Sequence, residues 1–289
     1  ATRCRRRIID VELARTDLPT AASEPARILR SAGGQAVLVR LLKTMRDEPF
    51  DRGYSHARLS KAAVLSHLVA VTFPEPGDTP GAFAAAVQAA GVAEQRLIDL
   101  AAYTPQWARF VEHALQWPGF EDAVWWLHAH TKDQRWGIDR EILEEWKAEI
   151  QQRTPLLAED LIDGAADVAW FWQAYTALGE KRWNALDRAA PYTGFGDGHK
   201  RAQIFADAMR GRLDKAQLLT RIATKRHQDS VRALGLLPLS EGAGREVDIE
   251  ERYGAVQEFV RTSAKFGPQR RENEKLAARI ALDNLARTA

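Results

Sequence analysis

The two histidines that lie closest together in the sequence, His128 and His130, belong to the run WWLHAH at 125–130. Close imidazoles are a common start of a metal site. On a helix, however, residues two positions apart point to different faces, so this pair is poorly placed to share one ion. His128 also falls beside Val124 and Leu127 on the apolar side of the expected helix, where a hydrogen-bonded core histidine is the more common role. The pair therefore predicts no metal site.

Other motifs of catalysis are missing from the sequence. None of the seven histidines is followed by aspartate, and no Glu-x-x-His, His-Glu-x-x-His, Asp-Asp-x-x-Asp or Gly-x-Ser-x-Gly motif occurs. The single cysteine, Cys4, excludes a disulfide framework and a cysteine-based zinc site. We therefore assign no catalytic residue, no metal and no cofactor, and an enzyme is the less favoured class. One enzyme hypothesis stays open, a pocket in which aromatic residues of the stretch 107–183 meet His199, His227 or nearby acids.

Basic side chains are the best candidates for binding. On a helix spanning 214–234, Arg221, Lys225 and Arg232 would share one polar stripe, while Arg226 falls on the apolar side and is expected to pair with Asp229. The stripe is either a solvated face or a contact surface for phosphates and other anions. Our candidate binding residues are Lys200, Arg201, Arg221, Lys225, Arg232, Lys265 and Arg270.

A glycine-rich stretch, TGFGDGHKR at 193–201, precedes part of this basic region. Alternating glycines before a helix can present backbone N–H groups to an anion. The stretch lacks the spacing of a P-loop, Arg201 stands where a P-loop has Ser or Thr, and no strand precedes it. A plain interhelical loop is the favoured interpretation.

Charge and aromatic residues are both segregated along the chain. Residues 121–167 carry twelve acids against five bases, and residues 200–232 carry nine bases against three acids, although the formal net charge is only +2. The near-neutral total gives no bulk argument for nucleic acid or membrane, but the segregation can mark interaction surfaces or two faces that meet within the fold. All nine tryptophans lie between Trp107 and Trp183. They predict a helix–helix core, with an aromatic groove as the alternative and Trp136 as the residue to check for exposure.

Helices are the elements that must position these residues. β-branched residues are sparse, and apolar residues recur at helical spacing, so we expect about eleven helices with short joins. The longer loops are expected at 73–81 and 237–247. Thr79-Pro80, Thr104-Pro105 and Thr154-Pro155 predict helix starts, and Gly267-Pro268 predicts the end of one helix and the start of the next. The predicted buried stripes are Ile138, Ile142, Trp146 and Ile150, then Val168, Trp172 and Tyr175, and finally Ile249, Tyr253, Val256 and Val260.

The fold class expected from this pattern is all-α. Helical hairpins in series form either an irregular HEAT-like array, which we favour, or a compact multi-helix bundle. The 289 residues, 45% apolar and 28% charged, fit one continuous globular unit with an N-terminal segment 1–102, a Trp-rich segment 103–190 and a basic segment 191–289. No apolar run approaches the roughly 20 residues that span a bilayer, and no secretory signal follows the N-terminal arginines, so we expect a cytoplasmic protein without a membrane partner.

Several long runs of residues resemble one protein family. They are WWLHAHTKD (125–133), GHKRA (198–202), FADAM (205–209), KRHQDSVRALGLLPL (225–239), RY (252–253), QEF (257–259), KFG (265–267), QR (269–270) and NLARTA (284–289). Together they are similar to the large bacterial proteins described as molybdate-metabolism-regulator-like, best from about residue 120 to the end and weakly before residue 100. The resemblance implies a long, mostly helical, HEAT-like protein of unknown function, of which this chain is an internal segment. Some members carry a WGR module, a domain associated with nucleic acid and poly(ADP-ribose) polymerases. The resemblance implies no catalytic residue and gives no evidence of molybdate binding.

These observations predict a helical scaffold or interaction segment of a larger cytoplasmic bacterial protein. Its partner would be another protein or the flanking domains of the same chain. The alternative is nucleic-acid binding through the basic face, as helical-repeat proteins do with a basic concave surface.

Overall fold

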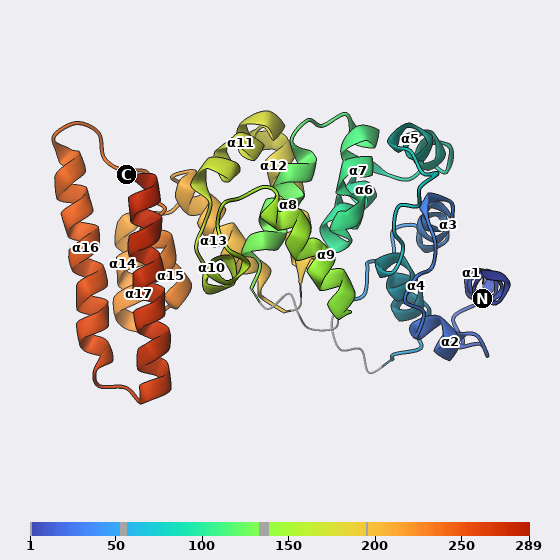
Figure 1. Ribbon diagram of the computed structural model, residues 1–289, viewed down its shortest axis with the longest axis horizontal. Coiled ribbons are helices and arrows are strands. Elements are labelled where there is room, and N and C mark those ends of the chain that lie inside the picture. Colours follow the sequence, from blue (N-terminus) through green and yellow to red (C-terminus); the bar gives the residue numbers. More distant parts are fainter. Residues whose placement is uncertain (1, 53–56, 133–138, 195) are drawn as a thin grey trace. The chain divides into compact units, whose positions relative to one another are not determined.

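The computed structural model describes residues 2–52, 57–132, 139–194 and 196–289. These residues form seventeen α-helices and two 3-10 helices and no strand, with one isolated bridge between Gly33 and Thr72 (Figure 1). The predicted all-α helical array is confirmed, whereas its irregular HEAT-like character stays a prediction. The helices outnumber the expected eleven because several are short, such as the five-residue α2 (Ser23–Arg27) and the six-residue α10 (Ala158–Asp163).

The chain divides into two compact units, each assembled from three stretches of sequence. Unit 1 comprises residues 1–128, 133–146 and 174–197, and unit 2 comprises residues 129–132, 147–173 and 198–289. The boundaries fall inside α8 (Phe120–His130), α9 (Arg140–Gln151) and α11 (Val168–Leu178). The three-segment division made from the sequence stays a prediction.

In unit 1, short helices pack around aromatic residues. Its remaining elements are α1 (Thr2–Ala14), α2, α3 (Gln35–Met45), α4 (Lys61–Ala70), α5 (Pro80–Ala89), α6 (Glu94–Tyr103), η1 (Pro105–Trp107), α7 (Ala108–Leu115), α12 (Glu180–Ala189) and η2 (Ala190–Thr193). α7 packs on α5 and α6, and α12 packs on α6. The buried Trp107 stacks on Phe83 at 5.8 Å between ring centroids, and its indole N–H donates to the Thr72 carbonyl at 3.1 Å. One aromatic side chain thus joins η1 to α5 and to the end of α4.

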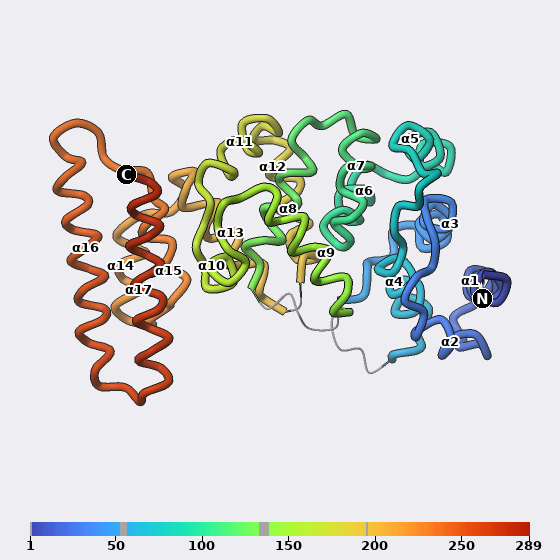
Figure 2. Tube along the Cα trace, in the orientation of Figure 1, coloured from blue at the N-terminus to red at the C-terminus, as the bar shows by residue number. Residues whose placement is uncertain are grey.

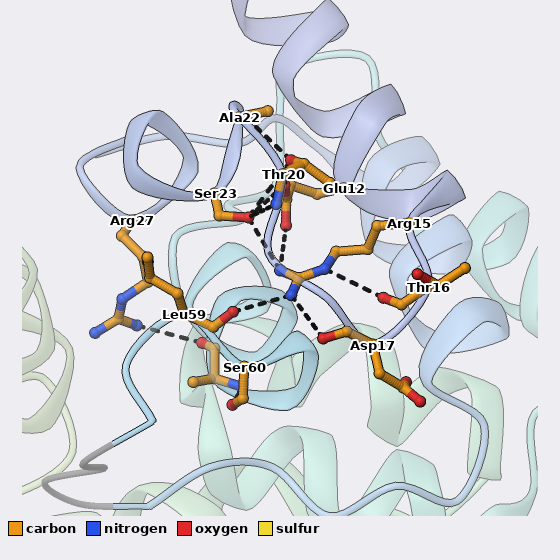
Figure 3. Close-up of polar contacts among 11 residues, drawn as sticks. Glu12, Arg15, Thr16, Asp17, Thr20, Ala22, Ser23, Arg27, Leu59 and Ser60 are labelled. Atoms are coloured by element: carbon orange, nitrogen blue, oxygen red, sulfur yellow. Dashed lines mark hydrogen bonds and ion pairs between the residues drawn. The ribbon is translucent and has the colours of Figure 1, made fainter.

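A buried ion pair holds the start of unit 1 together (Figure 3). Arg15 Nη1 donates to Glu12 Oε2 at 2.7 Å, and both side chains are withdrawn from solvent. Glu12 Oε1 accepts hydrogen bonds from the hydroxyls of Thr20 and Ser23, while Arg15 Nη2 reaches the Leu59 carbonyl at 2.9 Å. Because its charges are compensated and its donors are used, this cluster fixes α1, α2 and the start of α4 as one structural group.

Unit 2 is built around a long helical hairpin. Its elements besides those shared are α10, α13 (His199–Met209), α14 (Lys215–Lys225), α15 (Gln228–Leu234), α16 (Gly244–Ser263) and α17 (Pro268–Thr288). α16 and α17 run antiparallel side by side, and α15 packs on α17 (Figures 1 and 2). The buried Asn284 of α17 accepts from the Ala166 N–H at 3.0 Å and donates to the carbonyls of Gly164 and Arg232. One side chain thereby joins three parts of unit 2 that are distant in sequence.

Of the three predicted stripes, the one on α9 is confirmed and the other two need correction. Ile142, Trp146 and Ile150 are buried, and Ile138 lies outside the described residues. On α11, Trp172 is 40% exposed, because the buried face is one residue out of phase and carries Trp170 and Phe171.

On α16, Tyr253 is 52% exposed and a charged pair lies in the buried face instead. Arg252 bonds Asp248 through Nη2 at 2.6 Å and donates to the carbonyls of Leu237 and Pro238. Burial raises the pKa of Asp248, but hydrogen bonds from Arg252, the Ser240 N–H and Lys215 outweigh it and lower the pKa to about 2. A hydrophobic stripe alone could not locate this face, because the charged residues Asp248 and Arg252 are buried in it beside Val256 and Phe259.

Two of the four predicted helix boundaries are confirmed. The Thr79 hydroxyl accepts from the Ala82 N–H and caps α5, and α17 begins at Pro268. Thr104 precedes a 3-10 turn without a side-chain cap, since its hydroxyl donates back to the Leu100 carbonyl. Thr154 starts no helix, because its hydroxyl donates to Asp167 instead, at 2.7 Å.

The tryptophan cluster is core. Seven of the eight described tryptophans are buried, with Trp172 as the exception, and Trp136 lies outside the described residues. The rings of Trp126 and Trp183 meet edge to face at 5.8 Å, as do those of Trp125 and Trp146 at 6.5 Å. The predicted helix–helix core is therefore confirmed.

Candidate functional site

The helix expected across 214–234 is broken in two. α14 ends at Lys225, Arg226 adopts the left-handed conformation with φ of 50°, and α15 begins at Gln228. Arg221, Lys225 and Arg232 therefore do not form one helical stripe, and that prediction was wrong.

Tertiary contacts made by Arg226 account for the break. Its guanidinium bonds the buried Glu274 through Nε at 2.9 Å and through Nη2 at 2.5 Å, and it also donates to Thr262 and to the Phe259 carbonyl. Burial raises the pKa of Glu274, but hydrogen bonds from Arg226 and Arg270 outweigh it and lower the pKa. A bidentate arginine with a buried carboxylate is strong enough to hold a strained turn.

The predicted partner of Arg226 was also wrong. Asp229 pairs with Arg232 instead, at 3.0 Å. Arg226 reaches Glu274 because the left-handed turn redirects its side chain toward α17.

Two of the seven predicted binding residues are buried. Arg201, 4% exposed, donates from Nε to the His130 carbonyl at 2.9 Å and from Nη1 to the Ile162 carbonyl at 2.6 Å. These carbonyls lie at the C-terminal ends of α8 and α10, where a cation is favourable. Arg232, 8% exposed, bonds Asp229 and packs against Gly164, where an added Cβ would lie 2.5 Å from Arg232 Cδ. Both arginines hold the interior of unit 2 rather than a binding face.

The structure brings another set of cations together around His227. Its imidazole Nδ1 accepts from the Ser230 N–H and caps α15. The pKa of His227 is lowered, first by burial and then by the positive charges of Arg221, Lys132 and Lys225, against an opposing effect of Asp229. Three basic side chains thus lie near one half-buried imidazole in unit 2.

A second group of cations surrounds the ring of Phe266 at the turn between α16 and α17. The charged ends of Arg270, Arg226 and Lys265 lie 3.9, 5.0 and 5.5 Å from the ring centroid. Arg226 follows Lys225 directly, so the two groups adjoin at the C-terminal end of α14. We name as the basic surface the residues Lys132, Arg221, Lys225, His227, Lys265 and Arg270.

Sequence reasoning placed four of these six residues among its candidates. Lys200 is an exposed residue in the first turn of α13, two residues beyond Gly198, whose carbonyl accepts from the Lys132 N–H at 3.1 Å. Lys132 was missed because nothing local connects it to residues 221–227. His227 was considered only as part of a catalytic pocket.

The glycine-rich stretch holds two segments together. A Cβ on Gly198 would lie 2.0 Å from the Lys132 carbonyl oxygen, so only glycine fits there. Residues 194 and 196–198 connect η2 to α13, and Phe195 lies outside the described residues.

Among the described histidines, three that the sequence singled out have structural settings. His128 is buried and its Nε2 lies 2.9 Å from the Ala102 carbonyl, as expected for a core histidine. His199 is buried, and His227 caps a helix. Among the described residues, no three His, Cys, Asp or Glu side chains are arranged to hold a metal ion.

Comparison with known proteins identifies one family. A family model with the description "Family of unknown function (DUF5724)" matches residues 1–289. No curated protein and no solved structure matches the chain. In the part of the chain that the structure describes, no helix combines the length and the apolar character needed to cross a bilayer.

Proposed function

Because the chain belongs to the DUF5724 family of unknown function, its role has to be inferred from its surface, and we propose that it is an interaction segment that binds an acidic partner through the basic surface. The partner is another protein or a flanking domain. Its acidic side chains would meet cations at the C-terminal end of α14.

The uncompensated charge around His227 carries this proposal. The side chains of Lys132, Arg221 and Lys225 make no ion pair or hydrogen bond with any described residue, in contrast to Arg226 and Arg232. Unpaired cations that lie close together create a local positive potential, which attracts an oppositely charged partner and orients it.

Nucleic acid is the second candidate for the same surface, since phosphates seek the same cations. The ring of Phe266 offers no evident stacking platform for bases, because Arg226 and Arg270 already lie against it. We therefore rank an acidic polypeptide first.

The test compares polyglutamate, duplex DNA and single-stranded RNA as fluorescent probes, from about 20 to about 200 mM salt. The variant replaces Lys132, Arg221 and Lys225 by glutamate. The matched control makes the same charge change at Lys43, Lys181 and Arg188, which are exposed residues of unit 1. Circular dichroism confirms that both variants remain folded.

We expect polyglutamate binding that weakens as salt rises, is lost in the first variant and persists in the control. Stronger binding of DNA or RNA with the same dependence on these residues would assign the surface to nucleic acid, with a salt slope that falls by about three in the variant. No binding of any probe at the lowest salt, or equal loss in the control, would contradict the proposal.

A further inference from the structure

A pocket of about 300 Å³ opens on unit 1 between the start of α5 and the C-terminal part of α7, far along the chain from the basic surface. This volume is at the lower end of the range for small-molecule sites. Its lining residues are Pro80, Arg109, Glu112, His113, Gln116, Trp117 and Pro118.

The pocket has two side chains, Arg109 and His113, that can bind an anion. Arg109 and His113 are exposed and lie one helical turn apart on α7, so both flank the same opening. Neither side chain makes a hydrogen bond or an ion pair with a described residue. Gly81 lies beside them, and an added Cβ there would stand 3.9 Å from His113 Nε2, so the missing side chain leaves room at the imidazole.

The single acid that lines the pocket, Glu112, already accepts a hydrogen bond. Glu112 Oε2 accepts from the Glu121 N–H at 2.8 Å, in the first turn of α8. The positive end of that helix offsets the carboxylate charge. Glu112 therefore cancels less of the positive potential that Arg109 produces.

The remaining lining is rigid and flat. Trp117 is 9% exposed, and the guanidinium of Arg182 lies 5.4 Å from the centroid of its ring, so a second cation besides Arg109 is nearby. Gln116, in the left-handed conformation with φ of 55°, ends α7 and turns the chain toward Trp117 and Pro118. An indole and two prolines suit a flat apolar body, because they lose little conformational freedom on contact.

We propose that this pocket binds a small organic anion, with its carboxylate at Arg109 and His113 and its flat apolar body in the part of the pocket lined by Pro80, Trp117 and Pro118. Benzoate is the simplest compound that combines both features, and benzyl alcohol has the same ring without the charge. This proposal does not rest on the basic surface, so the two proposals are tested separately.

The test uses the full chain labelled with 5-fluorotryptophan and follows the fluorine resonance of Trp117, assigned with W117F. Arg109→Gln removes the charge that faces the pocket. Arg188→Gln removes an exposed arginine from α12 of the same unit and is the matched control.

We expect benzoate to shift the Trp117 resonance saturably, with a dissociation constant in the millimolar range. Benzyl alcohol should bind the unchanged protein about tenfold more weakly than benzoate, and Arg109→Gln should weaken benzoate binding about tenfold, since each change removes a charge-assisted hydrogen bond. Arg188→Gln should leave the dissociation constant of benzoate unchanged. No saturable shift of Trp117, equal affinity for the alcohol, or unchanged binding in Arg109→Gln would overturn the proposal.

Discussion

At the scale of single residues, His128 shows how a titratable group becomes part of the core. Burial lowers its pKa to about 4, although the hydrogen bond to the Ala102 carbonyl opposes the shift. Its ring and that of Trp146 meet edge to face, with 5.1 Å between centroids. The protein therefore folds around a neutral imidazole.

This environment makes stability depend on pH in a defined direction. In the unfolded chain His128 gains a proton near pH 6.5, whereas in the folded chain it does so only near pH 4. The contribution of neutral His128 to the unfolding free energy is therefore complete above pH 6.5 and is lost as the pH falls toward 4. The loss amounts to about 3 kcal/mol at most. His128→Gln, whose amide can still donate to Ala102, should flatten this part of the profile in urea titrations. A slope in His128→Gln equal to that of the unchanged protein would refute the assignment.

In unit 2, three arginines with little exposure donate hydrogen bonds to backbone carbonyls. Arg201, Arg226 and Arg252 each direct N–H groups at carbonyl oxygens near the ends of helices or turns. Such groups would otherwise lie buried without a donor. A basic residue in this sequence can therefore serve to hold the fold together, and its residue type alone does not mark a binding site.

At the scale of elements, the approach of α15 to α17 depends on a glycine. A Cβ on Gly235 would lie 2.2 Å from the Ala281 carbonyl oxygen and 2.8 Å from the Leu285 nitrogen, and neither backbone atom can move aside. Its φ of −69° suits any residue, so the requirement is one of space alone.

We expect Gly235→Ala to lower the unfolding free energy by about 2–3 kcal/mol, because it forces two helices apart. The matched change Gly254→Ala, inside α16 with nothing within 4 Å of the added Cβ, should raise it by about 0.5–1 kcal/mol through helix propensity. Denaturant unfolding followed by circular dichroism measures both. Similar effects of the two changes would show that α15 and α17 are not so closely packed.

The sequence predicts elements better than it predicts their faces and breaks. Helical spacing identified the all-α class and the buried face of α9, because those signals are local. The break at Arg226 carries neither Gly nor Pro and depends on Glu274, 48 residues further on. Arg201 and Arg221 look alike in sequence, and only tertiary packing makes the first a clamp and leaves the second at the surface. For the same reason Lys132 could not be assigned to the basic surface.

At the scale of the whole molecule, each unit is assembled from separate stretches of the chain, and this limits which fragments can fold alone. Residues 198–289 form the larger part of unit 2, but residues 129–132 and 147–173 belong to it as well. Asn284 bonds Gly164 and Ala166, and Arg201 bonds His130, Leu161 and Ile162. A cut between residues 197 and 198 would separate these partners and leave buried polar groups unpaired.

We therefore expect fragments 1–197 and 198–289, produced separately, to melt at lower temperature and with less cooperativity than the intact chain. Fragment 1–197 should also bind a hydrophobic dye, because Leu161 and Trp170 lose their cover. Mixing the fragments should restore a cooperative transition and abolish dye binding, since the missing contacts form again between chains. Asn284→Ala in fragment 198–289 should impair this recovery, whereas the exposed Asp283→Ala should not. A fragment 198–289 that melts alone at the temperature of the intact chain would show that the C-terminal helices need neither inserted stretch.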